Sequence, residues 1–265
     1  MTIKEYFASR KQEIRDSLFS LEVKPHFVVV QVNDDPASNA YVKGKLKDSA
    51  ELGITAELIK LPESTSEEKL LSLIKKLNKN QEIDGFIVQM PLPRHIDQQK
   101  IKLAISPEKD VDGFHPLSSL NPCTPQGIIN YLHHEGIVLQ SKNALVIGRS
   151  EIVGKPMAKL LLAENCNVTT VHSKTLREDM ERYVANADII VVAIGRQGFL
   201  DESFTYKKDA IIVDVGISRD ENGLHGDAVP NLPVGLQTPV PGGVGLLTRL
   251  ALMENLIKIY ERNHN

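Results

Sequence analysis

Short apolar runs rich in β-branched residues alternate with amphipathic helical stretches along most of this chain, and this alternation limits the possible folds most. Seven runs have the length of strands, at residues 26–32, 55–60, 84–89, 143–148, 167–171, 188–194 and 210–216. Helical periodicity fills the windows 3–21, 39–52, 66–79, 125–135, 153–164 and 246–262. Strands that alternate with helices form parallel sheets covered by helices, so we predict an α/β fold.

Two segments rich in proline, serine and glycine interrupt this pattern and indicate where domains end. "GFHPLSSLNPCTPQG" lies between the third and fourth strands, and "LPVGLQTPVPGGVG" precedes the last helical window. We therefore predict two α/β domains around a cleft. The first is expected to hold residues 1–117 with a C-terminal helix at 246–265, and the second residues 118–245.

The composition excludes several classes of protein. A net charge of -3 over 265 residues offers no basic surface for nucleic acid or for an anionic membrane. No apolar run has the length of a membrane span, and the charged N-terminal stretch does not resemble a signal peptide. Cys123 and Cys166 make neither a metal-binding spacing nor a disulfide framework. We therefore expect a cytoplasmic protein with no metal site and no nucleic-acid or membrane partner.

The segment "VIGRSEIVGKPM" has the order strand, glycine loop, helix. Gly148 and Gly154 would permit a tight turn and a dinucleotide pyrophosphate at the helix N-terminus, although such turns are also common without a ligand. The next strand leads into "HSKT" and lacks the acidic residue that binds a ribose 2′-hydroxyl. Arg149 and Ser173 could instead hold a 2′-phosphate, which favours NADP over NAD.

Tyr41 and Lys45 are spaced i,i+4 in a helical window and therefore share one face of that helix. Asp35 or Ser38 could cap the start of the helix, and Gly53 could end it. Taken alone, Lys45 has the features of an ordinary solvated surface lysine, because most lysines are exposed.

Three further segments carry polar or glycine residues at positions that suit a ligand. Gln89 ends a strand, where it is either a polar rim residue or part of a site outside the carboxyl end of the sheet. Asp110 and Asp112 precede a glycine, where such residues usually serve the turn itself. The loop "TPVPGGVG" is either a structural turn or a place where backbone lies flat against a ligand.

Together these segments resemble one family, methylenetetrahydrofolate dehydrogenase/methenyltetrahydrofolate cyclohydrolase of the bacterial FolD type. Nine motifs occur in the family's order: "DDPASNAYVKGKLK", "DGFIVQMPLP", "KDVDGFHP", "PCTPQG", "VIGRSEIVGKPM", "VHSKT", "DVGI", "GDAV" and "TPVPGGVG". Each motif alone is weak, but nine in order are specific.

The resemblance implies two α/β domains, the second a Rossmann-like NADP-binding domain, in a homodimer. It also implies two reactions in one-carbon metabolism and a link to purine biosynthesis. A hydride passes from 5,10-methylenetetrahydrofolate to NADP+, and water then opens the methenyl cation to 10-formyltetrahydrofolate.

Site residues follow from the same resemblance. Lys45 is similar to the family's catalytic lysine, Gln89 to the glutamine that hydrogen-bonds it, and Tyr41 to the tyrosine that stacks on folate. Asp112 is similar to the acid that anchors the pterin. A partly buried amine beside the methenyl cation could exchange a proton near neutral pH, with Gln89 fixing its direction.

The glycine-rich segments match the family in the same way. The residues implied to line the folate pocket are Gly242, Gly243 and Gly245. The residues implied to bind NADP are Gly148, Arg149, Ser150, Val153, Gly154 and Ser173.

The chain departs from the family pattern in three places. It begins directly with a helical window where relatives commonly carry a strand, and only "LSSLN" separates "GFHP" from "PCTP". Leu246 stands where proline is typical. Two alternatives remain open: a monofunctional dehydrogenase with impaired hydrolysis, linked to either NADP or NAD, and a folate- or nucleotide-binding protein without catalysis.

Overall fold

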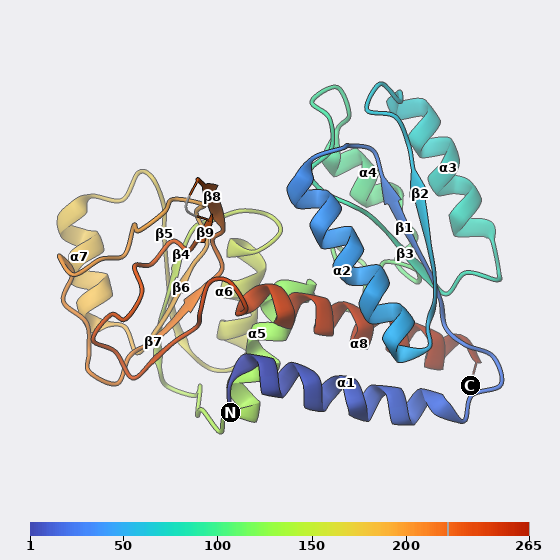
Figure 1. The fold of residues 1–265 in the computed structure, drawn as a ribbon. Coiled ribbons are helices and arrows are strands. Elements are labelled where there is room, and N and C mark those ends of the chain that lie inside the picture. The colour runs from blue at the N-terminus through green and yellow to red at the C-terminus, as the bar shows by residue number, and fades with distance from the viewer. Residues whose placement is uncertain (222, 265) are drawn as a thin grey trace. The chain divides into compact units, whose positions relative to one another are not determined.

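A computed structural model describes residues 1–221 and 223–264, which divide into two compact units (Figure 1). The 8–123 unit consists of Ala8–Cys123 and Arg249–Asn265, and the 124–248 unit of Met1–Phe7 and Thr124–Thr248. Three helices, α1 (Ile3–Phe19), α5 (Cys123–His134) and α8 (Val244–His264), contribute residues to both units. Within the described ranges, no helix is long and apolar enough to cross a membrane.

The 8–123 unit is built on a parallel sheet in the order β2-β1-β3. Its strands are β1 (His26–Gln31), β2 (Thr55–Lys60) and β3 (Gly85–Val88). The central strand β1 is buried along most of its length, as expected for a parallel strand covered on both faces. β2 forms one edge and is largely exposed.

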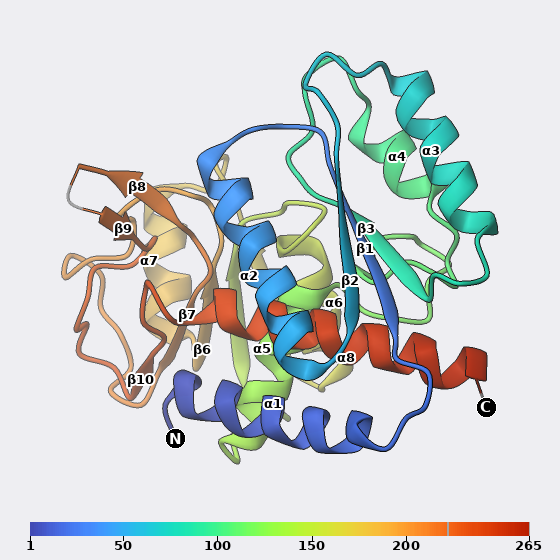
Figure 2. The ribbon, with the colours of Figure 1, turned by 45° about the vertical axis from the view of Figure 1, so that its right-hand side comes forward.

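Helices cover both faces of this sheet (Figures 1 and 2). On one face, α3 (Glu67–Lys79) and α4 (Gln98–Ala104) bury their apolar sides against β1 and β3. On the other face lies α2 (Pro36–Leu52), the helix that was predicted to carry Tyr41 and Lys45.

The sequence of α2 explains where this helix begins and ends. Asp35 is its N-cap, and the Asp35 carboxylate accepts a hydrogen bond from the backbone N–H of Ser38 at 2.7 Å. Pro36 occupies the first turn, where its missing N–H costs nothing. Gly53 ends the helix with a left-handed φ of 76°. Of the two caps considered from the sequence, Asp35 is therefore the one used.

The 124–248 unit contains a five-stranded parallel sheet in the order β10-β7-β6-β4-β5. The strands are β4 (Asn143–Ile147), β5 (Asn167–Val171), β6 (Ile189–Val192), β7 (Ile211–Asp214) and β10 (Leu236–Gln237). One face packs on α5 (Cys123–His134) and α6 (Gly154–Ala163), and the other on α7 (Arg177–Asn186). This is a doubly wound, Rossmann-like arrangement, so the predicted α/β class with parallel sheets is confirmed.

Several elements were not predicted, and all of them are short or mostly polar. α4 has 7 residues, and β10 has only 2. α7 buries just Met180 and Val184, one turn apart, in a mostly polar segment. The antiparallel hairpin of β8 (Ser218–Asp220) and β9 (Gly223–His225) is also too short for a periodic signal.

Candidate functional site

Lys45 and Gln89 form the centre of the candidate site in the 8–123 unit. Lys45 lies on α2 and is only 5% exposed, so it is not a solvated surface lysine. Its Nζ donates a hydrogen bond to Gln89 Oε1 at 3.0 Å. The Gln89 amide nitrogen in turn donates to the carbonyl of Met90 at 2.7 Å, which fixes the side-chain oxygen toward the lysine.

Asp112 and Tyr41 flank this pair. Burial raises the pKa of the Asp112 carboxyl, and the positive charges of Lys45 and Lys102 oppose this rise. Asp112 therefore lies within electrostatic reach of Lys45. Tyr41 is one helical turn before Lys45, and burial raises the pKa of its hydroxyl. The structure thus gathers Lys45, Gln89 and Asp112, with Tyr41 beside them on the same helix.

Asp110, the other acidic residue of the turn, serves the backbone. Its carboxylate accepts the N–H of His115 at 2.7 Å, and its side chain is almost fully buried. Burial raises the pKa of Asp110 to about 6, although the backbone N–H groups of His115, Gly113 and Phe114 act to lower it. The turn-forming interpretation therefore describes Asp110.

Lys102 was missed from the sequence, although it acts on this site. It lies buried on α4, with its Nζ 5.0 Å from the centre of the Phe114 ring. Ile101 and Ile105 beside it belong to the core. A lysine within a short segment whose neighbours are core isoleucines was the available signal.

In the 124–248 unit, the loop after β4 has the geometry expected for a pyrophosphate. Gly148 has a φ of 123°, and a Cβ on Gly154 would lie 2.5 Å from the Gly148 carbonyl oxygen. Both positions therefore require glycine. Ser150 Oγ accepts hydrogen bonds from the backbone N–H groups of Val153 at 3.3 Å and Gly154 at 3.2 Å, which orders the first turn of α6.

Arg149 and Ser173 occupy equivalent places in neighbouring loops. β4 pairs with β5 in a register that joins Ile147 to Val171, and each candidate residue follows two positions later. Both side chains are exposed. Their residue types suit a phosphate, because guanidinium and hydroxyl groups donate to phosphate oxygens.

Two exposed isoleucines at the same edge of the sheet were also missed. Ile194 follows β6 and Ile217 follows β7, so both lie beyond the carboxyl ends of parallel strands. Such a position suits the flat face of a bound ring. In the sequence, each isoleucine adjoins a glycine directly after a strand, which could have identified them.

In the loop of Gly242, Gly243 and Gly245, the backbone geometry requires glycine at positions 242 and 243. Gly242 has a φ of 90°, which favours glycine. A Cβ on Gly243 would lie 2.2 Å from the carbonyl oxygen of Pro239. Gly245 lies in the first turn of α8. Contact of this loop with folate stays a prediction.

None of the predicted cofactor residues lines a cavity of about 850 Å³ in the 124–248 unit. It is lined in part by Asp214, whose carboxylate accepts the backbone N–H groups of Asp227 at 2.9 Å and Ala228 at 2.8 Å. This carboxylate therefore already accepts hydrogen bonds from the backbone of the segment at residues 227–228. Over residues 1–221 and 223–264, no group of three or more His, Cys, Asp or Glu side chains could hold a metal ion.

Comparison with known proteins finds the same family in both parts of the chain. Residues 1–112 match the family described as tetrahydrofolate dehydrogenase/cyclohydrolase, catalytic domain, and residues 122–264 match its NAD(P)-binding domain. The chain is 49% identical to the bifunctional protein FolD of Streptococcus pneumoniae serotype 4 over 244 residues, which cover 87% of this chain and 84% of that protein. It is 45% identical to the bifunctional protein FolD of Ruminiclostridium cellulolyticum over 257 residues, which cover 92% of this chain and 89% of that one.

Solved structures agree with these relatives. The bifunctional enzyme FolD from Campylobacter jejuni superposes with a TM-score of 0.93 at 38% identity, covering 98% of this chain and 97% of that one. The Trypanosoma brucei enzyme FolD, solved with NADP cofactor and an inhibitor, superposes with a TM-score of 0.94 at 28% identity, covering 99% and 97%.

The raised pKa of Asp110 predicts a specific dependence of stability on pH. The folded chain binds a proton on Asp110 at higher pH than the unfolded chain, whose pKa is near the ordinary 3.8. The resulting stabilisation is complete below that value and is lost as the pH rises through about 6. Relative to Asp110→Asn, the wild type should lose roughly 2 kcal/mol of unfolding free energy between pH 4 and 7.

Urea unfolding of both proteins at several pH values measures this difference. Asp16→Asn, which removes an exposed carboxylate from α1, controls for the loss of one negative charge. A constant difference between wild type and Asp110→Asn across this pH range would contradict the prediction.

Proposed function

The chain belongs to the tetrahydrofolate dehydrogenase/cyclohydrolase family, and from that premise we propose how its residues carry the family's two reactions. It is a bifunctional enzyme of one-carbon metabolism. It oxidises 5,10-methylenetetrahydrofolate to the methenyl form with NADP, and it hydrolyses that product to 10-formyltetrahydrofolate. The predicted function and cofactor are confirmed.

The cofactor is proposed to bind along the carboxyl edge of the sheet in the 124–248 unit. NADP supplies the hydride acceptor, so the residues here bind and orient. We propose that the turn from Gly148 to Gly154, which Ser150 orders through its hydrogen bonds from Val153 and Gly154, lets the pyrophosphate approach the backbone at the start of α6. Arg149 and Ser173 would bind the 2′-phosphate by the two neighbouring loops, which favours NADP over NAD.

Hydrolysis is proposed to rely on Lys45, and the contact between Lys45 and Gln89 is the observation that carries this proposal. Water that attacks the methenyl carbon must lose a proton, and a positioned amine can relay it. The hydrogen bond of 3.0 Å to Gln89 fixes the direction of the Lys45 Nζ. Asp112 would accept hydrogen bonds from the pterin, and Tyr41 would stack on the folate.

Replacement of Lys45 by methionine should separate the two reactions. With 5,10-methylenetetrahydrofolate and NADP+, the wild type should form NADPH without a build-up of methenyl-folate. Lys45→Met should accumulate methenyl-folate, because hydrolysis falls by about a hundredfold or more once the proton relay is lost. The absorbances of NADPH and of methenyl-folate, followed directly at neutral pH, measure the two steps, and no acid quench is used because acid converts 10-formyltetrahydrofolate back to the methenyl form.

Lys43→Met is the matched control, because Lys43 is an exposed lysine on the same helix. Melting temperatures of both variants should show that the fold is retained. A Lys45→Met protein that hydrolyses methenyl-folate at the parent rate would refute the assignment. A wild type without turnover would instead favour a binding role.

Replacement of Arg149 by alanine should weaken NADP+ selectively. Loss of a charged contact to the 2′-phosphate should raise the KM for NADP+ by about tenfold to a hundredfold and leave the KM for NAD+ nearly unchanged. Initial rates at varied cofactor concentration measure both values. Lys159→Ala removes an exposed cation from α6 and serves as the control. Equal losses for NADP+ and NAD+ would show that Arg149 does not bind the 2′-phosphate.

We further propose that the enzyme is a cytoplasmic homodimer that supplies purine biosynthesis. The exposed edge strand β2 offers a surface for a second copy, because its outer edge pairs with no strand among the described residues. Leu58 on this strand is 40% exposed, next to a groove that also contains Val42 and Leu46. Growth of a deletion strain with and without purines tests the metabolic part.

Leu58→Glu should dissociate the homodimer, because it places a carboxylate in a contact that excludes water. Sedimentation velocity should find a dimer for the wild type and a monomer for this variant. Leu103→Glu is the control, since Leu103 is 47% exposed on α4 in the same unit. A monomeric wild type, or a Leu58→Glu protein that remains dimeric, would remove this surface from the proposal.

A further inference from the structure

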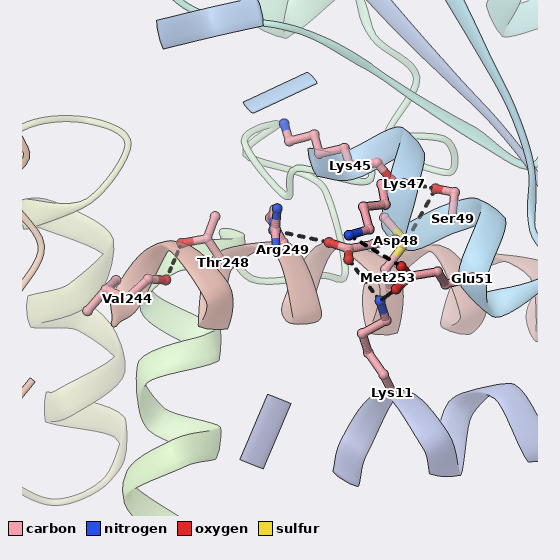
Figure 3. Close-up of polar contacts among 10 residues, drawn as sticks. All are labelled: Lys11, Lys45, Lys47, Asp48, Ser49, Glu51, Val244, Thr248, Arg249 and Met253. Carbon is pink, nitrogen blue, oxygen red and sulfur yellow. Dashed lines mark hydrogen bonds and ion pairs between the residues drawn. The ribbon is translucent and has the colours of Figure 1, made fainter. Parts of the chain in front are cut away.

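Arg249 of α8 faces the side of α2 that carries the candidate catalytic residues, and no role follows for it from the family motifs (Figure 3). Tyr41, Gly44, Lys45 and Asp48 are spaced three, one and three residues apart, so they share this side of α2. Arg249 extends toward it from α8, within the same compact unit.

Asp48 holds Arg249 in place. Asp48 is 3% exposed, and its Oδ2 lies 3.0 Å from Arg249 Nε. These two atoms are close but not aligned for a hydrogen bond, so their attraction is mainly Coulombic. The other oxygen of Asp48 accepts a hydrogen bond from Lys11 Nζ at 2.9 Å. A buried carboxylate with a cation on each oxygen fixes both partners.

Gly44 provides the space that the guanidinium occupies. A Cβ at position 44 would lie 2.2 Å from Arg249 Nη1 and 3.2 Å from its Cζ. The guanidinium therefore packs directly on the α2 backbone, between Tyr41 and Asp48 along the helix. Its charge also reaches Tyr41, where it opposes the effect of burial on the tyrosine hydroxyl.

We propose that Arg249, docked on Gly44 and held by Asp48, is a positioning residue that sets the place of the Tyr41 side chain for folate binding. This inference rests on the proposed function, because it assigns Tyr41 to the folate. It differs from a general stabilising role: Lys11 also pairs with Asp48, but the three atoms nearest to a Cβ at position 44 all belong to Arg249. Substitutions at Arg249 and Lys11 can therefore separate positioning from stability.

Gly44→Ala is the sharpest test. The new methyl group displaces the guanidinium, which is the far end of a flexible side chain, while alanine favours the helix over glycine. The melting temperature should therefore fall less than in Arg249→Met, because the arginine keeps its charge near Asp48. The KM for 5,10-methylenetetrahydrofolate should nevertheless rise about tenfold in oxidation, as should that for methenyl-folate in hydrolysis, with the KM for NADP+ unchanged within about twofold. If Arg249 had a purely structural role, the folate KM would follow the melting temperature across the variants.

Arg249→Met and Lys11→Met complete the comparison. Both remove one cation from Asp48, so both should lower the melting temperature. Only Arg249→Met should raise the folate KM about tenfold. Arg249→Lys should recover part of this loss, because the charge remains but the planar group does not.

A folate KM within about twofold of the parent in both Gly44→Ala and Arg249→Met would overturn the inference, as would equal KM increases in Arg249→Met and Lys11→Met. Calorimetric titration with tetrahydrofolate separates this result from failure of the proposed function. A wild type that binds tetrahydrofolate without turnover refutes the function, and the four variants then test the inference by their dissociation constants. A wild type that neither turns over nor binds would refute both.

Discussion

The burial of the Lys45 ammonium is the constraint on which the candidate site depends. A charge withdrawn from water is costly unless dipoles or opposite charges replace the water. Gln89 supplies the dipole through a contact of 3.0 Å, and Asp112 supplies the charge. Because Gln89 follows β3 and Lys45 lies on α2, this requirement ties the helix to the end of the sheet. The hydrogen bond to Gln89 that offsets the cost of burying Lys45 also fixes the direction in which its Nζ points.

Both sheets use the same geometric rule to place their polar residues. In a parallel sheet, strands end together at one edge, and the residues after them meet in space. Gln89 follows β3 in one unit, while Gly148 and Ser173 follow neighbouring strands in the other. The apolar cores hold the strands in register, and this fixes the positions of the loops that follow them. Glycines then allow close approach of the backbone in these loops. A Cβ on Gly154, for example, would lie only 2.5 Å from the Gly148 carbonyl oxygen.

The sequence was informative where a physical signal repeats, and uninformative where one residue acts alone. Every predicted strand was found, because runs of β-branched residues such as 26–32 and 210–216 differ clearly in composition from the segments around them. The family resemblance supplied the roles of Lys45 and Gln89, which spacing alone left open. Lys102 and Arg249 lie outside the family motifs, and their importance arises from partners that are distant in sequence; the core isoleucines beside Lys102 are the one local signal for it.

The shortened connection after "GFHP" illustrates how tertiary contacts can compensate for a departure in sequence. A Cβ on Gly113 would lie 2.5 Å from the carbonyl oxygen of Asn121, so the two ends of this connection pack closely. Asn255 of α8 donates to the carbonyl of Val111 at 3.0 Å and to that of Asn121 at 3.2 Å, which fastens both ends. Asp112 lies between these anchored points. The backbone around Asp112 is therefore fixed within electrostatic reach of Lys45. The anchoring of its two ends, more than its length, sets the position of this connection.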